Sequence, residues 1–414
     1  MNKRAFWIHY FIYLIKWPLL ACIIGATVGG LVRVFNLSID WITYETYSFW
    51  LFGLPIVGGL TTWLIGKWEP GVYGDGTQIY IDRVDQPPNH SLRLLLGKFA
   101  ATIATLGTGG SGGRVGPFVL IGSIVGKLST HLRIFPHPRD TRVTAVCGAA
   151  AGMGALFGAP LGGGIFAAEV LFASSLDYNV LFPAILASMV GYMVNHLILG
   201  GMSFGCRLDY TFSAHHLPVI LTAIAFSAVV GMIFVYIYEE IKLPFSGKKR
   251  FRWIYPIIGG GGITVIGLIF GRKVMGTGED MVLTALNNHN YIVGGIILLI
   301  GKLLATTMTV KSGGSGGLTF PAIIMGALSA NIISRLFGIG DTVLHHAVIC
   351  AGITAAMASV LNTPIAAGII MLELFGVRAA PPVVLGAVLG FIIGRPMVIY
   401  SYRDKGIWKK SRGI

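Results

Sequence analysis

Apolar segments long enough to cross a lipid bilayer recur along the whole chain. A helix needs roughly 20 apolar residues to cross about 30 Å of hydrocarbon, and nothing here alternates with the period of two that is typical of a membrane β-barrel. With 54% hydrophobic and 12% charged residues among 414, the sequence predicts an all-α protein that crosses the membrane many times. The apolar segments are residues 5–32, 50–66, 145–172, 180–201, 217–237, 254–271, 292–310, 347–372 and 382–400.

The chain also contains a duplication. TGGSGGRVGP at 108–117 matches SGGSGGLTFP at 312–321, which lies 204 positions later, and the same offset pairs Pro160 with Pro364 and Glu169 with Glu373. A third pair, GDGTQ at 74–78 and GTGED at 276–280, is 202 positions apart. We therefore predict a first membrane repeat over 1–241, a basic linker at 242–252, a second repeat over 253–402 and a basic tail at 403–414.

Positive charge collects beside the apolar segments. The net charge of +14 comes largely from MNKR, the 242–252 segment and the C-terminal YRDKGIWKKSRGI. The positive-inside rule explains this distribution and predicts that both termini and the middle loop are cytoplasmic. Without a soluble domain to carry a basic patch, nucleic-acid binding is not indicated. The scattered cysteines have no metal-ligand spacing, so neither a metal nor a cofactor is expected.

The two glycine-rich motifs interrupt apolar sequence at corresponding places in the two repeats. Paired interruptions of this kind point to the substrate site of a channel or transporter. A helix that begins inside the membrane has unpaired N–H groups and the positive end of its dipole, which suit an anion. Pro117 and Pro321 are suited to the first turns of such helices. The alternative is a purely structural role as a tight helix crossing.

These motifs resemble those of the CLC chloride channels and proton-coupled chloride transporters. The resemblance extends from about residue 20 to 402 and is carried by GSGGRVGPFVLIGS, GAAAGMGALFGAPLGGGIFAAE, SGGSGGLTFPAII and LNTPIAAGIIMLE. It implies two halves of inverted topology and a homodimer with a separate pore in each subunit. It also implies an anion site built from the backbone of two motifs, made up of Gly113, Arg114, Val115 and Gly116 in the first and Gly317, Leu318, Thr319 and Phe320 in the second.

The chain departs from the family pattern at the gate. The family usually has Gly-Arg-Glu-Gly-Pro where this chain has residues 113–117, and the glutamate is gate and proton carrier. Val115 occupies that position. Valine has neither a titratable proton nor an oxygen that competes with the anion, so the resemblance implies a passive conductor.

Asp75 is a second departure, because it stands where the family motif Gly-Ser-Gly-Ile-Pro places an anion-contacting serine. An ionised carboxylate 4 Å from a halide is repelled by roughly 4 kcal/mol at an effective dielectric of 20. Asp75 is then a helix cap, a pore group that is protonated or paired, or a gate. These alternatives stay open.

Two pore residues of the second half differ as well. Thr319 takes the place of the usual Phe in the family's Gly-x-Phe-x-Pro motif, beside Phe320. For the family's pore tyrosine, Val398 is in strict register and Tyr400 lies two positions later. Tyr400 is either an anion donor or an interfacial tyrosine.

The sequence therefore predicts a non-enzymatic, homodimeric membrane protein that conducts chloride or a similar small inorganic anion without proton coupling. We expect a multi-pass location in a prokaryotic inner membrane. The alternatives are an anion/proton antiporter that uses Asp75 as its proton carrier, a membrane enzyme acting on an anionic headgroup, and a non-conducting scaffold.

Overall fold

Helices make up almost all of the chain in the computed structural model, which describes residues 3–86, 91–132, 140–172, 176–200, 207–241, 253–287 and 292–400. Two isolated β-bridges occur within these residues, which contain no β-strand. The all-α prediction is confirmed. The basic linker 242–252 and the tail 403–414 lie outside the described residues.

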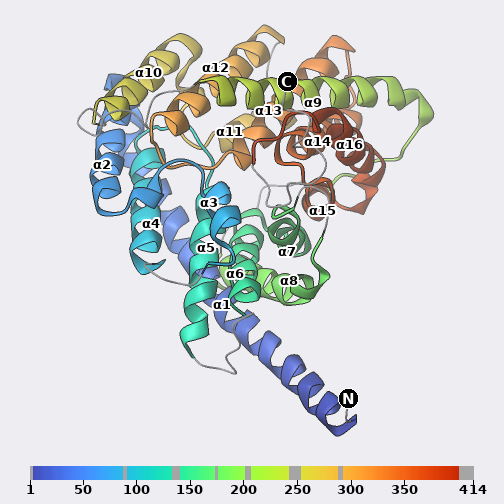
Figure 1. The fold of residues 1–414 in the computed structure, drawn as a ribbon. Helices are drawn as coiled ribbons and strands as arrows, with labels where there is room; N and C mark the ends of the chain where they lie inside the picture. Colours follow the sequence, from blue (N-terminus) through green and yellow to red (C-terminus); the bar gives the residue numbers. More distant parts are fainter. Residues whose placement is uncertain are drawn as a thin grey trace, which may run out of the picture.

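Sixteen α-helices follow one another within the described residues, and their order repeats after the eighth (Figure 1). The first eight are α1 (Lys3–Thr46), α2 (Leu54–Trp68), α3 (Gly76–Arg83), α4 (Ser91–Gly107), α5 (Val115–Ser129), α6 (Asp140–Phe157), α7 (Pro160–Glu169) and α8 (Tyr178–Tyr192). The second eight are α9 (Leu217–Glu240), α10 (Ile254–Phe270), α11 (Glu279–Leu286), α12 (Ile292–Lys311), α13 (Thr319–Leu336), α14 (Thr342–Leu361), α15 (Pro364–Phe375) and α16 (Ala380–Gly394).

Helix α9 belongs with the second half. It packs against α13, α14 and α16, as α1 packs against α5, α6 and α8. The boundary between the halves therefore falls between α8 and α9, and the expected boundary at 242–252 places α9 on the wrong side. The basic linker misled the sequence interpretation because it separates α9 from α10 within one half.

Two predicted apolar stretches are each divided into two helices. Gly158, with φ of 72°, ends α6 before Pro160 begins α7, and Asn362, with φ of 56°, ends α14 before Pro364 begins α15. These positions, 158 and 362, are 204 apart. Glycine and asparagine are the residues that most readily adopt this left-handed conformation, so both halves break the apolar stretch in the same way.

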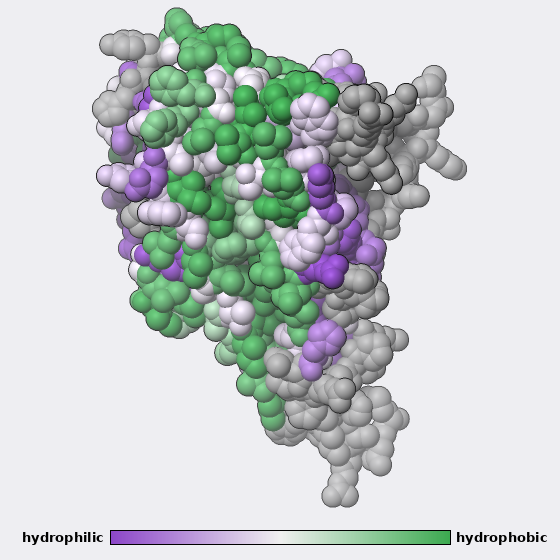
Figure 2. Space-filling view, turned by 90° about the vertical axis from the view of Figure 1, so that its left-hand side faces the viewer, coloured by the Kyte–Doolittle hydropathy of each residue, from purple (hydrophilic) through white to green (hydrophobic). Residues whose placement is uncertain are grey.

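The surface of the helical bundle is suited to lipid. Seven helical segments of the described residues are long and apolar enough to cross a membrane. Apolar residues cover much of the face shown in Figure 2. The exposed large side chains of α2, α4 and α10 are Val57, Leu64 and Trp68, then Leu92 and Leu96, then Ile258, Val265, Leu268 and Ile269. By contrast, the spanning helix α13 is almost wholly interior.

The two halves are joined by exchanged hydroxyl contacts. Thr102 of α4 lies 2.8 Å from the hydroxyl of Ser315 in the second motif, and Thr306 of α12 lies 3.1 Å from the hydroxyl of Ser111 in the first. One turn further on, Thr105 accepts the Ser315 N–H and Thr309 accepts the Ser111 N–H. Each glycine-rich motif is thus held by the long helix of the opposite half.

Candidate functional site

The two glycine-rich motifs meet in the middle of the molecule. The amide of Gly113 donates to the carbonyl of Gly317 over 2.7 Å, and the amide of Gly317 donates to the carbonyl of Gly113 over 2.7 Å. A Cβ on Gly317 would lie 2.6 Å from the nitrogen of Gly116, which is closer than real Cβ contacts. Glycine at 317 therefore allows the first turns of α5 and α13 to approach each other.

Neither of these two helices has a side-chain cap. Their N-cap residues, Arg114 and Leu318, make no capping hydrogen bond, whereas the interior helices α3, α7 and α15 are capped by the carboxylates of Asp75, Glu373 and Glu169 respectively. The first N–H groups of a helix have no partner within it. Protein carboxylates therefore complete the N-termini of α3, α7 and α15, whereas the N-termini of α5 and α13 stay open to another acceptor.

Asp75 lies directly against this junction. One carboxylate oxygen, Oδ2, accepts the Thr77 amide at 3.0 Å and so caps α3. The other, Oδ1, is buried without a hydrogen-bond partner, and a Cβ on Gly116 would come within 1.9 Å of it. One oxygen of Asp75 therefore caps α3, and the other lies beside the N-terminus of α5.

Three hydroxyl groups surround the carboxylate of Asp75. The Tyr400 side chain is close enough to interact with Asp75, Thr77 and Thr319. The hydroxyl oxygens of Tyr400, Thr77 and Thr319 are nevertheless all buried without a direct hydrogen-bond partner. Buried polar atoms without partners are rare and call for an unseen partner such as water or an ion. Three hydroxyl groups beside two helix N-termini without side-chain caps are chemically suited to an anion.

Two buried lysines hold the loops that lead into this site. Lys98 of α4 donates to the carbonyls of Val72 and Gly74, at 3.0 and 2.7 Å. Lys302 of α12 donates to Gly276 and Thr277, at 2.9 and 3.3 Å. The sequence interpretation missed both, although a signal was present: each is a cation within an apolar helix, and 98 and 302 differ by the repeat offset of 204.

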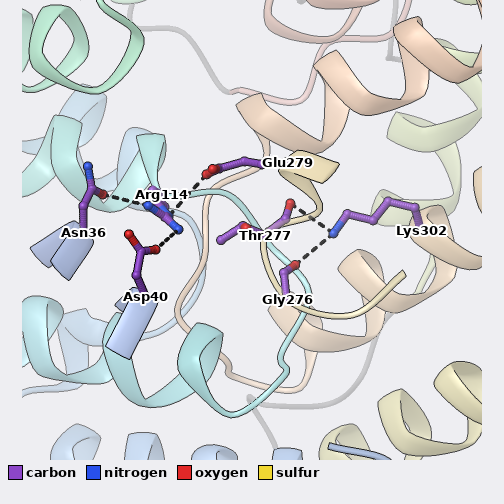
Figure 3. A network of polar contacts seen from close by, with 7 residues as sticks. All are labelled: Asn36, Asp40, Arg114, Gly276, Thr277, Glu279 and Lys302. Carbon is purple, nitrogen blue, oxygen red and sulfur yellow. Dashed lines mark hydrogen bonds and ion pairs between the residues drawn. The ribbon is translucent and has the colours of Figure 1, made fainter. Parts of the chain in front are cut away.

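The Arg114 side chain lies in a polar network with Asn36, Asp40 and Glu279 (Figure 3). Its guanidinium donates to Asn36 at 3.0 Å and to Asp40 at 2.8 Å, both on α1, and Glu279 of α11 lies 3.4 Å from its Nε. The side chain is therefore engaged by α1 and α11. Only the backbone of Arg114, at the N-cap of α5, lies at the junction of the two motifs.

The remaining predicted residues lie around the same junction. Val115 is 2% exposed and begins α5. Leu318 and Phe320 are buried beside it, and Phe320 stacks on Phe157 with 6.5 Å between ring centroids. The hydroxyl of Tyr400 lies in the cluster. Val398, the residue in strict register with the family tyrosine, is half-buried. The structure thus brings together every predicted site residue except the guanidinium of Arg114. Sequence reasoning did not single out Thr77.

Comparison with known proteins identifies the family. The family model described as "Voltage gated chloride channel" matches residues 53–395. The chain belongs to the CLC family. An uncharacterised protein of Methanocaldococcus jannaschii is 32% identical over 401 residues, which cover 95% of this chain and 96% of that protein.

Other CLC relatives differ in how their transport is described. A chloride/fluoride channel protein of Pseudomonas syringae pv. tomato is 26% identical, over 97% of this chain and 89% of its own length. A slow cyanobacterial Cl⁻/H⁺ antiporter has a similar structure, with a TM-score of 0.81, 19% identity and coverage of 92% and 94% of the two chains. A CLC-type fluoride/proton antiporter also has a TM-score of 0.81, with 23% identity and coverage of 94% and 97%. These likenesses establish the CLC fold and anion transport across a membrane.

Proposed function

We propose that this CLC protein conducts a small inorganic anion passively, through a pathway within each subunit and without proton coupling. The observation that carries the proposal is the junction of the uncapped α5 and α13 N-termini with the unsatisfied hydroxyls of Thr77, Thr319 and Tyr400. Val115 at the start of α5 supports the passive mode, because valine has no proton to exchange.

The anion is chloride or fluoride. Relatives are described as a chloride/fluoride channel and as antiporters of either ion. In this chain hydroxyl and amide donors surround the proposed site, and both halides accept hydrogen bonds from such groups. Competition between the two ions in one flux assay determines which is preferred.

The mode of transport is tested in liposomes loaded with chloride or fluoride. A potassium ionophore clamps the voltage while anion efflux and external pH are recorded together. We expect efflux without proton movement. Proton movement driven by the anion gradient contradicts the passive mode, and absence of flux for both ions contradicts conduction itself.

Asp75 favours a second candidate function, anion/proton antiport. Its Oδ1 is buried, lacks a partner and lies beside the proposed anion site, so it is positioned to exchange a proton where Val115 is not. Antiport predicts that Asp75→Asn abolishes proton movement while anion flux continues. Asp82→Asn is the matched control, since Asp82 is an exposed carboxylate on the same helix α3.

We also propose that the protein is a homodimer in a prokaryotic inner membrane, with both termini in the cytoplasm. Exposed apolar side chains gather on α7, α8, α15 and α16 and provide a surface for a second copy. Cross-linking between copies in native membranes tests the dimer. The exposed side chains are Leu161, Phe182, Met189, Ile365, Val384, Val388 and Ile392.

A further inference from the structure

The guanidinium of Arg114 is neutralised from two directions. Asp40 approaches from α1 and Glu279 from the first turn of α11, which belongs to the other half of the chain (Figure 3). The guanidinium also donates a hydrogen bond to the amide oxygen of Asn36. A single cation at the N-cap of α5 therefore faces two carboxylates.

The partners of Arg114 differ in their access to water. The Arg114 side chain is 13% exposed, whereas the carboxyl side chains of Asp40 and Glu279 are 61% and 46% exposed. The carboxylates thus stand on the solvent side of the guanidinium. Lys302 is the other cation near Glu279, but it is fully buried and its ammonium is bound to the carbonyls of Gly276 and Thr277.

Arg114 immediately precedes Val115 and Gly116, which belong to the proposed anion site. Given a cytoplasmic N-terminus, Asp40 near the far end of α1 lies on the outer side of the membrane. An anion arriving from that side meets the two exposed carboxylates before it meets the positive guanidinium. Like charges repel the anion, and the effect on exposed groups reaches about one Debye length.

We propose that Glu279 and Asp40 mask the positive charge of Arg114 and so limit the entry of anions at the outer mouth. This inference rests on the proposed conduction pathway and adds a determinant of anion affinity that lies outside the anion site. The chain carries a net charge of +14, so the placement of two of its few carboxylates at this point opposes the attraction that the protein otherwise exerts on anions.

The test measures anion uptake by proteoliposomes against external anion concentration. Glu279→Gln removes one masking charge and keeps the side-chain size. We expect the half-saturating anion concentration to fall about two- to fivefold at low ionic strength, the range expected for exposed ion pairs, with an unchanged maximal rate. The difference disappears near 1 M of a large impermeant electrolyte, where the Debye length is about 3 Å.

Asp280→Asn is the matched control. Asp280 precedes Met281 in the same first turn of α11 and carries the same charge as Glu279, but its side chain makes no contact with Arg114 within the described residues. We expect a clearly smaller effect from this variant. An equal effect shows that net charge, and not the contact with Arg114, controls entry. Asp40→Asn should act in the same direction as Glu279→Gln, and less strongly, because Asp40 is the more exposed.

A structural role for the network gives a different result. If Glu279 only holds Arg114 in position, Glu279→Gln lowers the maximal rate at every ionic strength and leaves the half-saturating concentration unchanged, and that result overturns the proposal. If the wild type conducts neither anion, the proposed function fails. Calorimetric titration of the purified protein with chloride and with fluoride then still tests whether Glu279 masks the charge of Arg114. Tighter binding by Glu279→Gln supports it, and equal binding overturns it.

Discussion

Glu169 and Glu373 cap each other's helices. Glu169, the last residue of α7, accepts the amides of Ile365 and Ala366 at the start of α15. Glu373, within α15, accepts the amides of Leu161 and Gly162 at the start of α7. Each carboxylate therefore completes the N-terminus of the equivalent helix in the other half, and neither is available as a proton carrier without loss of a cap.

Glu169→Gln should destabilise the protein more than Glu373→Gln. A glutamine has only one acceptor oxygen for the two amides, and the loss of a cap costs about 1 kcal/mol. The cost is larger at Glu169, which is 7% exposed and whose bond to Ala366 is buried, whereas Glu373 is half-buried, because an unsatisfied buried amide adds its desolvation penalty. Thermal unfolding of the detergent-solubilised protein measures the difference. Equal melting temperatures for wild type and Glu169→Gln would contradict the capping role.

Gly116→Ala should abolish anion flux. The new methyl group would lie 1.9 Å from Oδ1 of Asp75, so either the carboxyl group or the first turn of α5 must move. Gly316→Ala is the control, since its Cβ meets nothing closer than 3.4 Å, and it should conduct normally. The second variant Asp75→Gly in the Gly116→Ala background removes the clash with Asp75 and leaves only the 3.0 Å approach to Cα of Gly317, and recovery of flux would locate the cause at Asp75. Normal flux in Gly116→Ala alone would place the pathway elsewhere.

Tyr400→Phe should weaken anion binding without unfolding the protein. The hydroxyl makes no direct hydrogen bond within the protein, although it lies near Asp75, Thr77 and Thr319, so its removal should cost the fold little. A hydrogen bond to a charged group contributes about 1.5–3 kcal/mol, so the dissociation constant should rise roughly tenfold or more. Titration calorimetry with chloride and fluoride measures it. Tyr210→Phe is the control, because that hydroxyl bonds to His216. Unchanged affinity in Tyr400→Phe would exclude Tyr400 from the site.

Val115→Glu should make conduction depend on pH. A carboxylate at the first position of α5 competes with the anion for the helix N-terminus. Flux should therefore be low at neutral pH and should recover as the pH falls and the glutamate becomes neutral. Val115→Gln controls for side-chain size and should lack this pH dependence. If Val115→Glu conducts as the wild type does at every pH, Val115 does not line the pathway.

The duplication was the part of the fold that the sequence predicted best. Motifs 204 residues apart predicted that the segments with Gly113 and Gly317 converge on one site, because matched interruptions in two halves do so; the contacts of Glu169 and Glu373 with the opposite half were not predicted. The packing of α9 against α13, α14 and α16 groups it with the second half, whereas the charge of the 242–252 linker placed the predicted boundary after α9.

The details of the site depend on contacts between the halves, which sequence patterns do not contain. Nothing in the composition of α4 indicates that Thr102 bonds to Ser315 of the other half. The position of Tyr400 follows from the path of the chain after α16, and strict sequence register favours Val398 instead. The sequence likewise does not show that one carboxylate oxygen of Asp75 caps α3 while the other lies beside Gly116. That division of roles becomes visible only in the structure.

The reciprocal amide pair of Gly113 and Gly317 has a consequence for biosynthesis. When the ribosome has completed only the first half, the amide of Gly113 has no Gly317 carbonyl to bind, and the Tyr400 hydroxyl has not yet been made. A nascent or truncated chain therefore inserts helices into the membrane without assembling an anion pathway. Chains that stop before the second half do not leak anions, because they lack the Gly317 and Tyr400 that complete the proposed site.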